Sequence, residues 1–261
     1  MECSKIIRQI EETFPPQYAC GWDNVGLLVG DDRQQVHTVF LALDATDEVI
    51  EQAAAQHADM LITHHPLIFH GMKRVTADDF IGRRILRLAQ EQIAYYAMHT
   101  NYDIAGMGMA AAKRLDLQAA QALEVTVEED GERKGIGVCG ELSHEMTLLE
   151  CAKLVKERFG ISNVRIFGDG AHIVKRAAVV PGSGGSDIRN AVQAGAQVYI
   201  TGDISHHDGL DAMAQGLAVV DAGHYGLEHI FAGELEEFLK KAFGDEITVC
   251  RAREKEPYLT V

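Results

Sequence analysis

The amino-acid sequence predicts an α/β fold in which parallel strands alternate with helices. Short apolar runs typical of buried strands alternate with segments of helical periodicity. This strand–helix order occurs in both halves of the 261-residue chain. Polar side chains able to bind a metal follow several of the apolar runs directly. Ligands of parallel sheets bind beyond the carboxyl ends of the strands, so these side chains mark the expected site.

The first half begins with a predicted helix over residues 4–14, which ends at Pro15-Pro16 because proline cannot continue a helix. Thr46-Asp47 predicts the cap of a second helix, which runs to Gln56. The other expected elements of this half are strands at 36–45, 59–63 and 93–99 and helices at 78–92 and 107–115.

The second half echoes the first. Residues 196–203 match residues 58–65 position for position, and residues 217–224 parallel residues 93–99. We interpret this echo as a duplicated βαβ unit. The other expected elements are strands at 177–182 and 163–167, a helix at 148–159 and a helix that starts at 186. The charged, glycine-punctuated segment 125–140 connects the halves, with a turn at 128–131.

Composition limits the classes of partner. Lys and Arg number 24 against 39 Asp and Glu, and the net charge of −15 disfavours a nucleic-acid partner. The five cysteines are widely spaced without a CxxC motif, which argues against a disulfide framework and a thiolate zinc site. No apolar run approaches the roughly 20 residues that span a bilayer. The amphipathic N-terminus is unlike a signal peptide. We therefore expect a cytoplasmic protein without a membrane partner.

The pair His64-His65 is the most informative feature of the chain. Adjacent strand residues point to opposite faces, but at a strand end both imidazoles can turn toward one crevice. His99 and Asp103 stand four residues apart, as do His224 and Glu228. Three such clusters predict a metal site with more than one ion.

Each of these candidates has an alternative role. Glu228 could ligate a metal together with His224 or only orient that imidazole, and the bracketing Gly223 and Gly226 favour ligation. Asp103 could be a ligand or the N-cap of the helix expected at Met107. His99 could be a ligand or could hold one in place.

Two further segments are candidates for substrate contacts. His206-His207 could face the substrate or, with Ser205 and Asp208 beside it, begin a helix. The glycine-rich segment 182–186 resembles a phosphate-cradling turn before a helix, although it lacks the lysine of a P-loop.

The donor types indicate the chemistry. Imidazole and carboxylate ligands suit zinc, iron, manganese, nickel or cobalt. Three histidines and two carboxylates exceed what one tetrahedral zinc with an open position needs, and they fit two ions about 3.5–4 Å apart. Such a pair of ions activates water at neutral pH and binds phosphoryl or carbonyl oxygens. Hydrolysis that uses two divalent metal ions is therefore the natural activity.

The chain resembles the GTP cyclohydrolase 1 type 2 homologues, also called the Nif-three-like family, in its short form without a mid-chain insert. The resemblance rests on Trp22-Asp23-Asn24-Val25-Gly26-Leu27, Thr63-His64-His65-Pro66-Leu67 with Phe69, His99-Thr100-Asn101-Tyr102-Asp103, Thr201-Gly202-Asp203 and Gly223-His224-Tyr225 with Glu228. It implies two similar, interleaved α/β domains with largely parallel sheets, a dinuclear metal site between them and a toroidal homohexamer. The implied metal ligands are His64, His65, Asp103, His224 and Glu228.

We expect the first domain at 1–124 plus about 220–261 and the second at 125–219. The expected function is metal-dependent hydrolysis of a nucleotide or related phosphorylated compound, with His99 or His206 transferring protons. The alternative is a non-catalytic metal-binding, regulatory or DNA-damage-related protein that forms a ring. The apolar residues Leu67, Ile68, Phe69 and Met72 are expected at or near a subunit contact.

Overall fold

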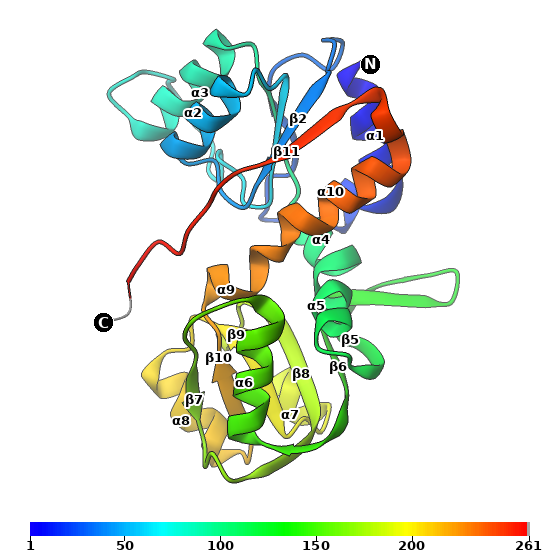
Figure 1. Ribbon diagram of the computed structural model, residues 1–261, viewed down its shortest axis with the longest axis vertical. Coiled ribbons are helices and arrows are strands. Elements are labelled where there is room, and N and C mark those ends of the chain that lie inside the picture. The colour runs from blue at the N-terminus through cyan, green and yellow to red at the C-terminus, as the bar shows by residue number, and fades with distance from the viewer. Residues whose placement is uncertain (260–261) are drawn as a thin grey trace. The chain divides into compact units, whose positions relative to one another are not determined.

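The computed structural model describes residues 1–259, which form two compact units (Figure 1). The first unit comprises Met1–Tyr102 and Phe231–Lys255, and the second comprises Asp103–Ile230 with the C-terminal residues from Glu256. These units record where residue contacts concentrate. The predicted domain boundaries, at residue 124 and near residue 220, describe parts that fold independently, and they stay a prediction.

The first unit contains a five-stranded sheet in the order β1-β4-β3-β2-β11. Its strands are β1 (Gly26–Val29), β2 (Thr38–Ala42), β3 (Met60–Thr63), β4 (Ala94–Ala97) and β11 (Thr248–Arg251). All neighbours are parallel except β1, which is antiparallel to β4. The helical elements are α1 (Cys3–Thr13), η1 (Pro16–Tyr18), α2 (Asp47–Ala55), α3 (Phe80–Gln90), α4 (Thr100–Tyr102), η4 (Gly244–Glu246) and, from Phe231, α10 (Ile230–Phe243).

Caps and core packing explain these elements. The Thr46 side chain accepts a hydrogen bond from Val49 N at 3.2 Å, which confirms the predicted start of α2. Phe40, Leu61 and Tyr95 of the strands pack in one buried cluster with Ile50 of α2 and Leu88 of α3. The cluster fixes the strand ends from which the polar residues project.

The second unit contains a six-stranded sheet in the order β5-β6-β8-β9-β10-β7. Its strands are β5 (Gln118–Glu129), β6 (Glu132–Thr147), β7 (Arg165–Phe167), β8 (Ile173–Ser183), β9 (Val198–Gly202) and β10 (Ala218–Asp221). The helical elements are the π-helix η2 (Asp103–Met107), α5 (Gly108–Arg114), α6 (Leu148–Phe159), η3 (Gly185–Asp187), α7 (Ile188–Gln193), α8 (His206–Ala214) and α9 (His224–Glu228).

Strand direction corrects one expectation. Only the β8–β9 and β9–β10 pairs of the second sheet are parallel, whereas its other three pairs are antiparallel. The prediction of largely parallel sheets thus holds for the first unit and is wrong for the second. The difference comes mainly from segment 125–140, which forms parts of the long strands β5 and β6 instead of a connection. Its turn was predicted correctly, since Asp130 and Gly131 have φ values of 51° and 82°, as a tight hairpin requires.

Both units nevertheless share a four-stranded motif. The order β1-β4-β3-β2 in the first unit corresponds to β7-β10-β9-β8 in the second, and in each an antiparallel strand flanks three parallel ones. The repeated sequences 58–65 and 196–203 contain the equivalent strands β3 and β9. The topology therefore agrees with the duplication inferred from the sequence.

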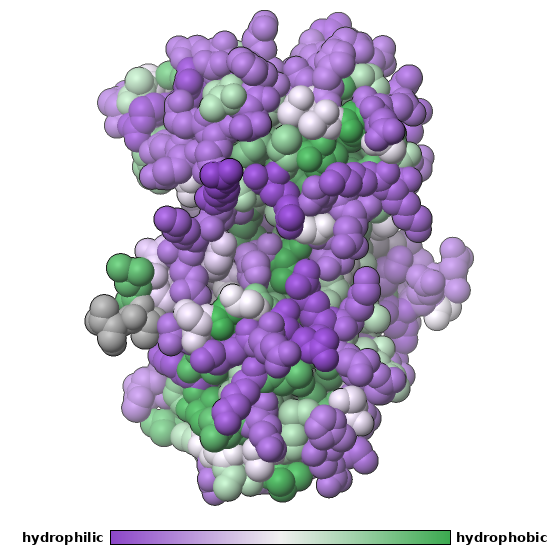
Figure 2. Space-filling model, in the orientation of Figure 1, coloured by the Kyte–Doolittle hydropathy of each residue, from purple (hydrophilic) through white to green (hydrophobic). Residues whose placement is uncertain are grey.

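The visible surface is mainly hydrophilic. Figure 2 shows a face on which hydrophilic residues predominate and apolar residues form small separate areas. Among the described residues, no helix combines the length and the apolar character needed to cross a membrane.

Candidate metal centre

The ends of β3 and β4 bring three histidines together in the first unit. His64, His65 and His99 each offer one ring nitrogen within 4.8 Å of the others. Their ring centroids are 4.9 Å apart for His64–His65, 5.2 Å for His64–His99 and 5.5 Å for His65–His99. The predicted turn of both neighbouring imidazoles toward one crevice is thus seen, and the group could hold a metal ion.

All three rings are oriented through Nδ1. His64 Nδ1 donates a hydrogen bond to the Met98 carbonyl oxygen at 2.8 Å. A carbonyl only accepts, so the lone pair of the neutral His64 ring lies on Nε2. His65 Nδ1 lies 2.9 Å from Asp44 Oδ1, and His99 Nδ1 lies 2.9 Å from Asp23 Oδ1. Metal-binding histidines are characteristically held in this way by a carboxylate or carbonyl, so the donor set fits a divalent ion.

Tyr95 and Thr63 fix the backbone around His65. The Tyr95 hydroxyl lies 2.7 Å from Thr63 Oγ1 and 3.0 Å from the His65 carbonyl oxygen, and it accepts from Leu67 N at 2.8 Å. Burial raises the pKa of Tyr95 to about 12, which keeps the hydroxyl protonated as a donor. The chain after β3 therefore follows one path.

Asp23 is a second positioning residue, which the analysis of the sequence included only in a motif. Its side chain is inaccessible and accepts from His99 Nδ1, from Thr100 N at 3.0 Å and from Thr100 Oγ1 at 2.5 Å. Burial raises the pKa of Asp23, but the hydrogen bonds from His99 and Thr100 outweigh burial, and the net pKa is well below its ordinary value. Asp23 thus stays ionised and holds His99.

In the second unit, His224 and Glu228 occupy one face of α9. His224 Nε2 lies 2.8 Å from Glu228 Oε2, and His224 Nδ1 lies 2.9 Å from Asp203 Oδ2. Glu228 is buried, with 3% of its surface exposed. Asp203 already orients the imidazole, so Glu228 is not needed for that role. The arrangement favours metal ligation by both His224 Nε2 and Glu228.

Two glycines make this arrangement possible. A Cβ at Gly182, where φ is +84°, would lie 2.3 Å from Glu228 Oε1. A Cβ at Gly202 would lie 2.5 Å from His224 N. At Gly202 the close atom is backbone, so a side chain is excluded there. At Gly182 a side chain would be strained by the positive φ and would require Glu228 to shift. Gly226 differs, because its Cβ would only touch Ile161 at 3.4 Å.

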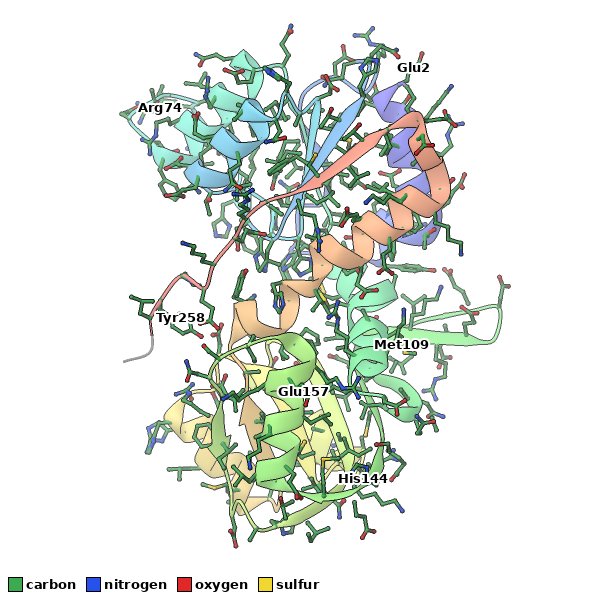
Figure 3. All side chains as sticks on the ribbon, in the orientation of Figure 1. Glu2, Arg74, Met109, His144, Glu157 and Tyr258 are labelled. Atoms are coloured by element: carbon green, nitrogen blue, oxygen red, sulfur yellow. The ribbon has the colours of Figure 1, made fainter. Side chains whose placement is uncertain are left out.

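Asp221 and Tyr258 are residues of this region that the sequence did not reveal. Asp221 is buried, pairs with Arg165, and accepts from Ile204 N at 3.2 Å and Gly223 N at 3.0 Å. It thereby ties the loops after β9 and β10 together. The hydroxyl of Tyr258, on the C-terminal segment (Figure 3), lies 2.7 Å from the position of a Cβ at Gly223. Asp221 ends strand β10 and Tyr258 lies on the C-terminal segment, and neither had a ligand-like partner at a telling sequence spacing.

Asp103 begins the π-helix η2 and not α5. Met107, which precedes α5, makes no side-chain cap, and Asp103 lies four residues farther back. The N-cap role at Met107 is therefore wrong for Asp103. π-Helical turns are frequent at functional sites, which keeps ligation as the role we favour for this carboxylate.

The structure supports a helix start for the segment with the second histidine pair, and it disfavours an anion site at the glycine-rich turn. Ser205 Oγ caps α8 by accepting from Asp208 N at 3.2 Å, and His206 and His207 are exposed in its first turn. The glycine-rich turn is crowded by its own unit, since a Cβ at Gly184 would lie 2.1 Å from Thr201 Oγ1. The buried Asp187 carboxylate follows the turn, which disfavours an anion there.

Comparison with known proteins assigns the family. Residues 1–257 match the family model described as Duf34/NIF3 (NGG1p interacting factor 3), and the chain belongs to this family. It is 34% identical over 259 residues to a Clostridium perfringens protein named GTP cyclohydrolase 1 type 2 homolog, covering 99% of both chains. A Clostridium acetobutylicum protein of the same name is 36% identical over 221 residues, with 84% of this chain and 82% of that protein covered.

Solved structures agree with the assignment. A Bacillus cereus protein related to NIF3 superposes with a TM-score of 0.91 at 25% identity, covering 100% of this chain and 99% of that one. Reduced HcgD from Methanocaldococcus jannaschii gives a TM-score of 0.82 at 29% identity, with 97% and 98% covered. The resemblance read from the sequence is thereby confirmed.

Proposed function

We propose that this protein is a metal-dependent hydrolase that acts on a nucleotide or a related phosphorylated compound. The observation that carries the proposal is the common orientation of the histidines. His65, His99 and His224 each have Nδ1 against a carboxylate, and His64 has it against a carbonyl. In His64, His65 and His224 this arrangement prepares Nε2 for a metal, and in His99 it leaves Nε2 for proton transfer. The names of the Clostridium relatives favour a guanine nucleotide as the substrate class.

In this proposal two divalent ions are held by His64, His65, Asp103, His224 and Glu228. When bound, the ions activate water and stabilise the charge that develops on the substrate. The chain's own residues orient and transfer protons. Asp44 and Asp203 hold His65 and His224, while His99, kept in place by the ionised Asp23, is the proton carrier. His206 is a second candidate for that role because its imidazole is exposed at the start of α8.

The test is a substrate screen on protein whose metal content has been measured. Nucleoside triphosphates, cyclic nucleotides and pterin-like compounds would be assayed with the wild-type protein and the His99→Ala and His206→Ala variants. We expect turnover of at least one nucleotide, and a loss of about 10²–10⁴-fold in kcat when the proton carrier is removed. Metal-loaded protein without turnover in any of these classes would refute the proposal.

We also propose that the protein forms a homo-oligomer, most simply a hexamer built from dimers, in the cytoplasm. The support is the exposed apolar surface of the loop before α3 and of its first turn, where Val75 is 44% and Phe80 is 54% exposed. Leu67 does not contribute, because it is buried in the core of its own unit. Sedimentation of a monomer of about 29 kDa at micromolar concentration would contradict oligomerisation.

A further inference from the structure

We propose that Trp22 and Phe69 form an aromatic platform on which the planar heteroaromatic ring of the substrate stacks beside His99. The inference rests on the proposed function and makes its substrate class more specific. It selects compounds that contain a nucleobase-like ring over phosphorylated sugars. All of the residues that carry it belong to the first unit.

The two rings lie together on the surface. Their centroids are 5.7 Å apart with an interplanar angle of 49°, and the Trp22 and His99 centroids are 5.9 Å apart. Trp22 is 61% exposed and Phe69 is 40% exposed. A tryptophan normally buries most of its large apolar surface, so an exposed aromatic pair indicates a surface that contacts a ligand.

The platform is rigidly connected to the histidines. Asp23, next to Trp22, accepts the hydrogen bond from His99 Nδ1. Asn24 Nδ2 donates to the Ile68 carbonyl oxygen at 2.6 Å, and so holds the residue before Phe69. Three consecutive residues therefore supply a ring, a hydrogen bond to the histidine group and a hydrogen bond to the backbone of the residue before the second ring. Such preorganisation lowers the entropic cost of binding a flat ligand.

Phe80 of the same unit is also exposed, but its surroundings differ from those of Trp22 and Phe69. The Arg84 guanidinium lies 5.2 Å from the Phe80 ring centroid and covers it with a cation. Trp22 and Phe69 instead have aromatic neighbours, including His70 at 4.9 Å from Phe69. Stacking on such rings tolerates every nucleobase, because each base has a π-face. In this proposal the platform recognises the heteroaromatic ring, and the bound metal ions would recognise the phosphates.

Trp22 is the only tryptophan of the chain, so its fluorescence reports on this surface alone. The metal-loaded protein would be titrated, with excitation near 295 nm, with guanosine, GTP, ribose 5-phosphate and inorganic phosphate. We expect guanosine and GTP to quench the emission, and the two compounds without a heteroaromatic ring, ribose 5-phosphate and inorganic phosphate, to leave it unchanged. Phe69→Leu should weaken guanosine binding about 10-fold, whereas the control Phe80→Leu should not change it.

The outcomes separate the platform from the hydrolase. Quenching without turnover supports the platform and counts against the hydrolase. If a nucleotide is turned over and neither Phe69→Leu nor Trp22→Leu changes its KM, the platform is wrong and the hydrolase proposal still holds. Equal quenching by ribose 5-phosphate also overturns it. An emission shift on dilution without ligand would show that a second copy of the chain covers Trp22, which overturns it as well.

Discussion

The two units place their polar residues with the same backbone motif but use different side chains. After β3 and β4 the first unit carries His64, His65 and His99. After the equivalent strands β9 and β10, the second unit carries Asp203 and His224, with Glu228 one turn farther along α9. The first group is rich in nitrogen and the second is rich in oxygen. Topology thus determines where ligands can lie, and the residues at each strand end determine which ions and substrates they suit.

The two groups are also held by different means. In the first unit, hydrogen bonds from Tyr95 and to Asp23 fix the histidines. In the second, the absence of side chains at Gly182 and Gly202 admits Glu228 and the α9 backbone. Removal of a hydrogen-bonding side chain should therefore disturb the first group most. Addition of a methyl group at one of the two glycines should disturb the second group most.

The largest expected effect concerns the ligands themselves. Glu228→Gln should lower the metal content from the two ions per chain that we propose to below one, because an amide is a far weaker ligand than a carboxylate. His99→Ala should lower it less, since we assign proton transfer to His99. Elemental analysis after dialysis measures both. A Glu228→Gln protein that retains two equivalents of metal would contradict the assignment.

The next effect tests the glycines of the second unit. Gly182→Ala should displace Glu228 and also cost about 1–2 kcal/mol of unfolding free energy, because φ is +84°. Gly195→Ala is the matched control. Its φ is +72°, but its Cβ would meet nothing within 4 Å. We expect similar destabilisation in denaturant for both variants and loss of metal for Gly182→Ala only. Loss of metal from both would show that backbone strain, and not contact with Glu228, is responsible.

The sequence predicted the features that depend on local pattern. The helix at 148–159 matches α6 residue for residue, and Thr46 caps α2 as expected. The strand-end positions of His64 and His65 follow from the apolar run before them. Their proximity to His99 follows from the parallel register of β3 and β4. These features were accessible because apolar periodicity and parallel topology together determine them.

Contacts between segments far apart in the chain could not be predicted from the sequence. Strand β5 alternates exposed and half-buried positions without an apolar run, so the sequence did not predict a strand there. Asp44 and Asp23 are the partners of His65 and His99, but they lie 21 and 76 residues away in sequence. One weaker signal existed for Asp44, because it follows β2 at the same edge of the sheet as His65.

A matched pair of substitutions compares the two groups directly. Asp44 and Asp203 each hold a histidine Nδ1 at 2.9 Å, and their side chains are 48% and 53% exposed. Asp44→Asn and Asp203→Asn should each weaken metal binding about 10–100-fold, because the amide no longer fixes the tautomer and orientation of the ring. Competition with a chelating dye measures the affinity. If only one variant binds more weakly, only that unit's histidine is a ligand.

The smallest effect concerns two buried thiols, one in each unit. Burial, reinforced by Asp32 and Asp31, raises the pKa of Cys3 to about 11, and burial raises that of Cys151 to about 12. At pH 8 only roughly one in 10³ and one in 10⁴ of these thiols is ionised, and the reactive thiolate fraction rises tenfold with each unit of pH. Native protein should therefore react slowly with a disulfide reagent at both positions.

Single-cysteine variants that retain Cys3 or Cys151 turn these thiols into probes of each unit. Cys3 Sγ lies 4.0 Å from Met60 Sδ on β3, the strand that leads to His64, whereas Cys151 lies in α6 of the second unit. If the proposed ions take ligands from both units, removing metal with a chelator should accelerate both reactions by a similar factor, because bound ions would stabilise both units against opening. A third variant that retains only the half-buried Cys250 controls for direct effects of the chelator. Acceleration at Cys3 alone would show that the histidines of the first unit bind metal without the second, and the shared set of five ligands would then be wrong.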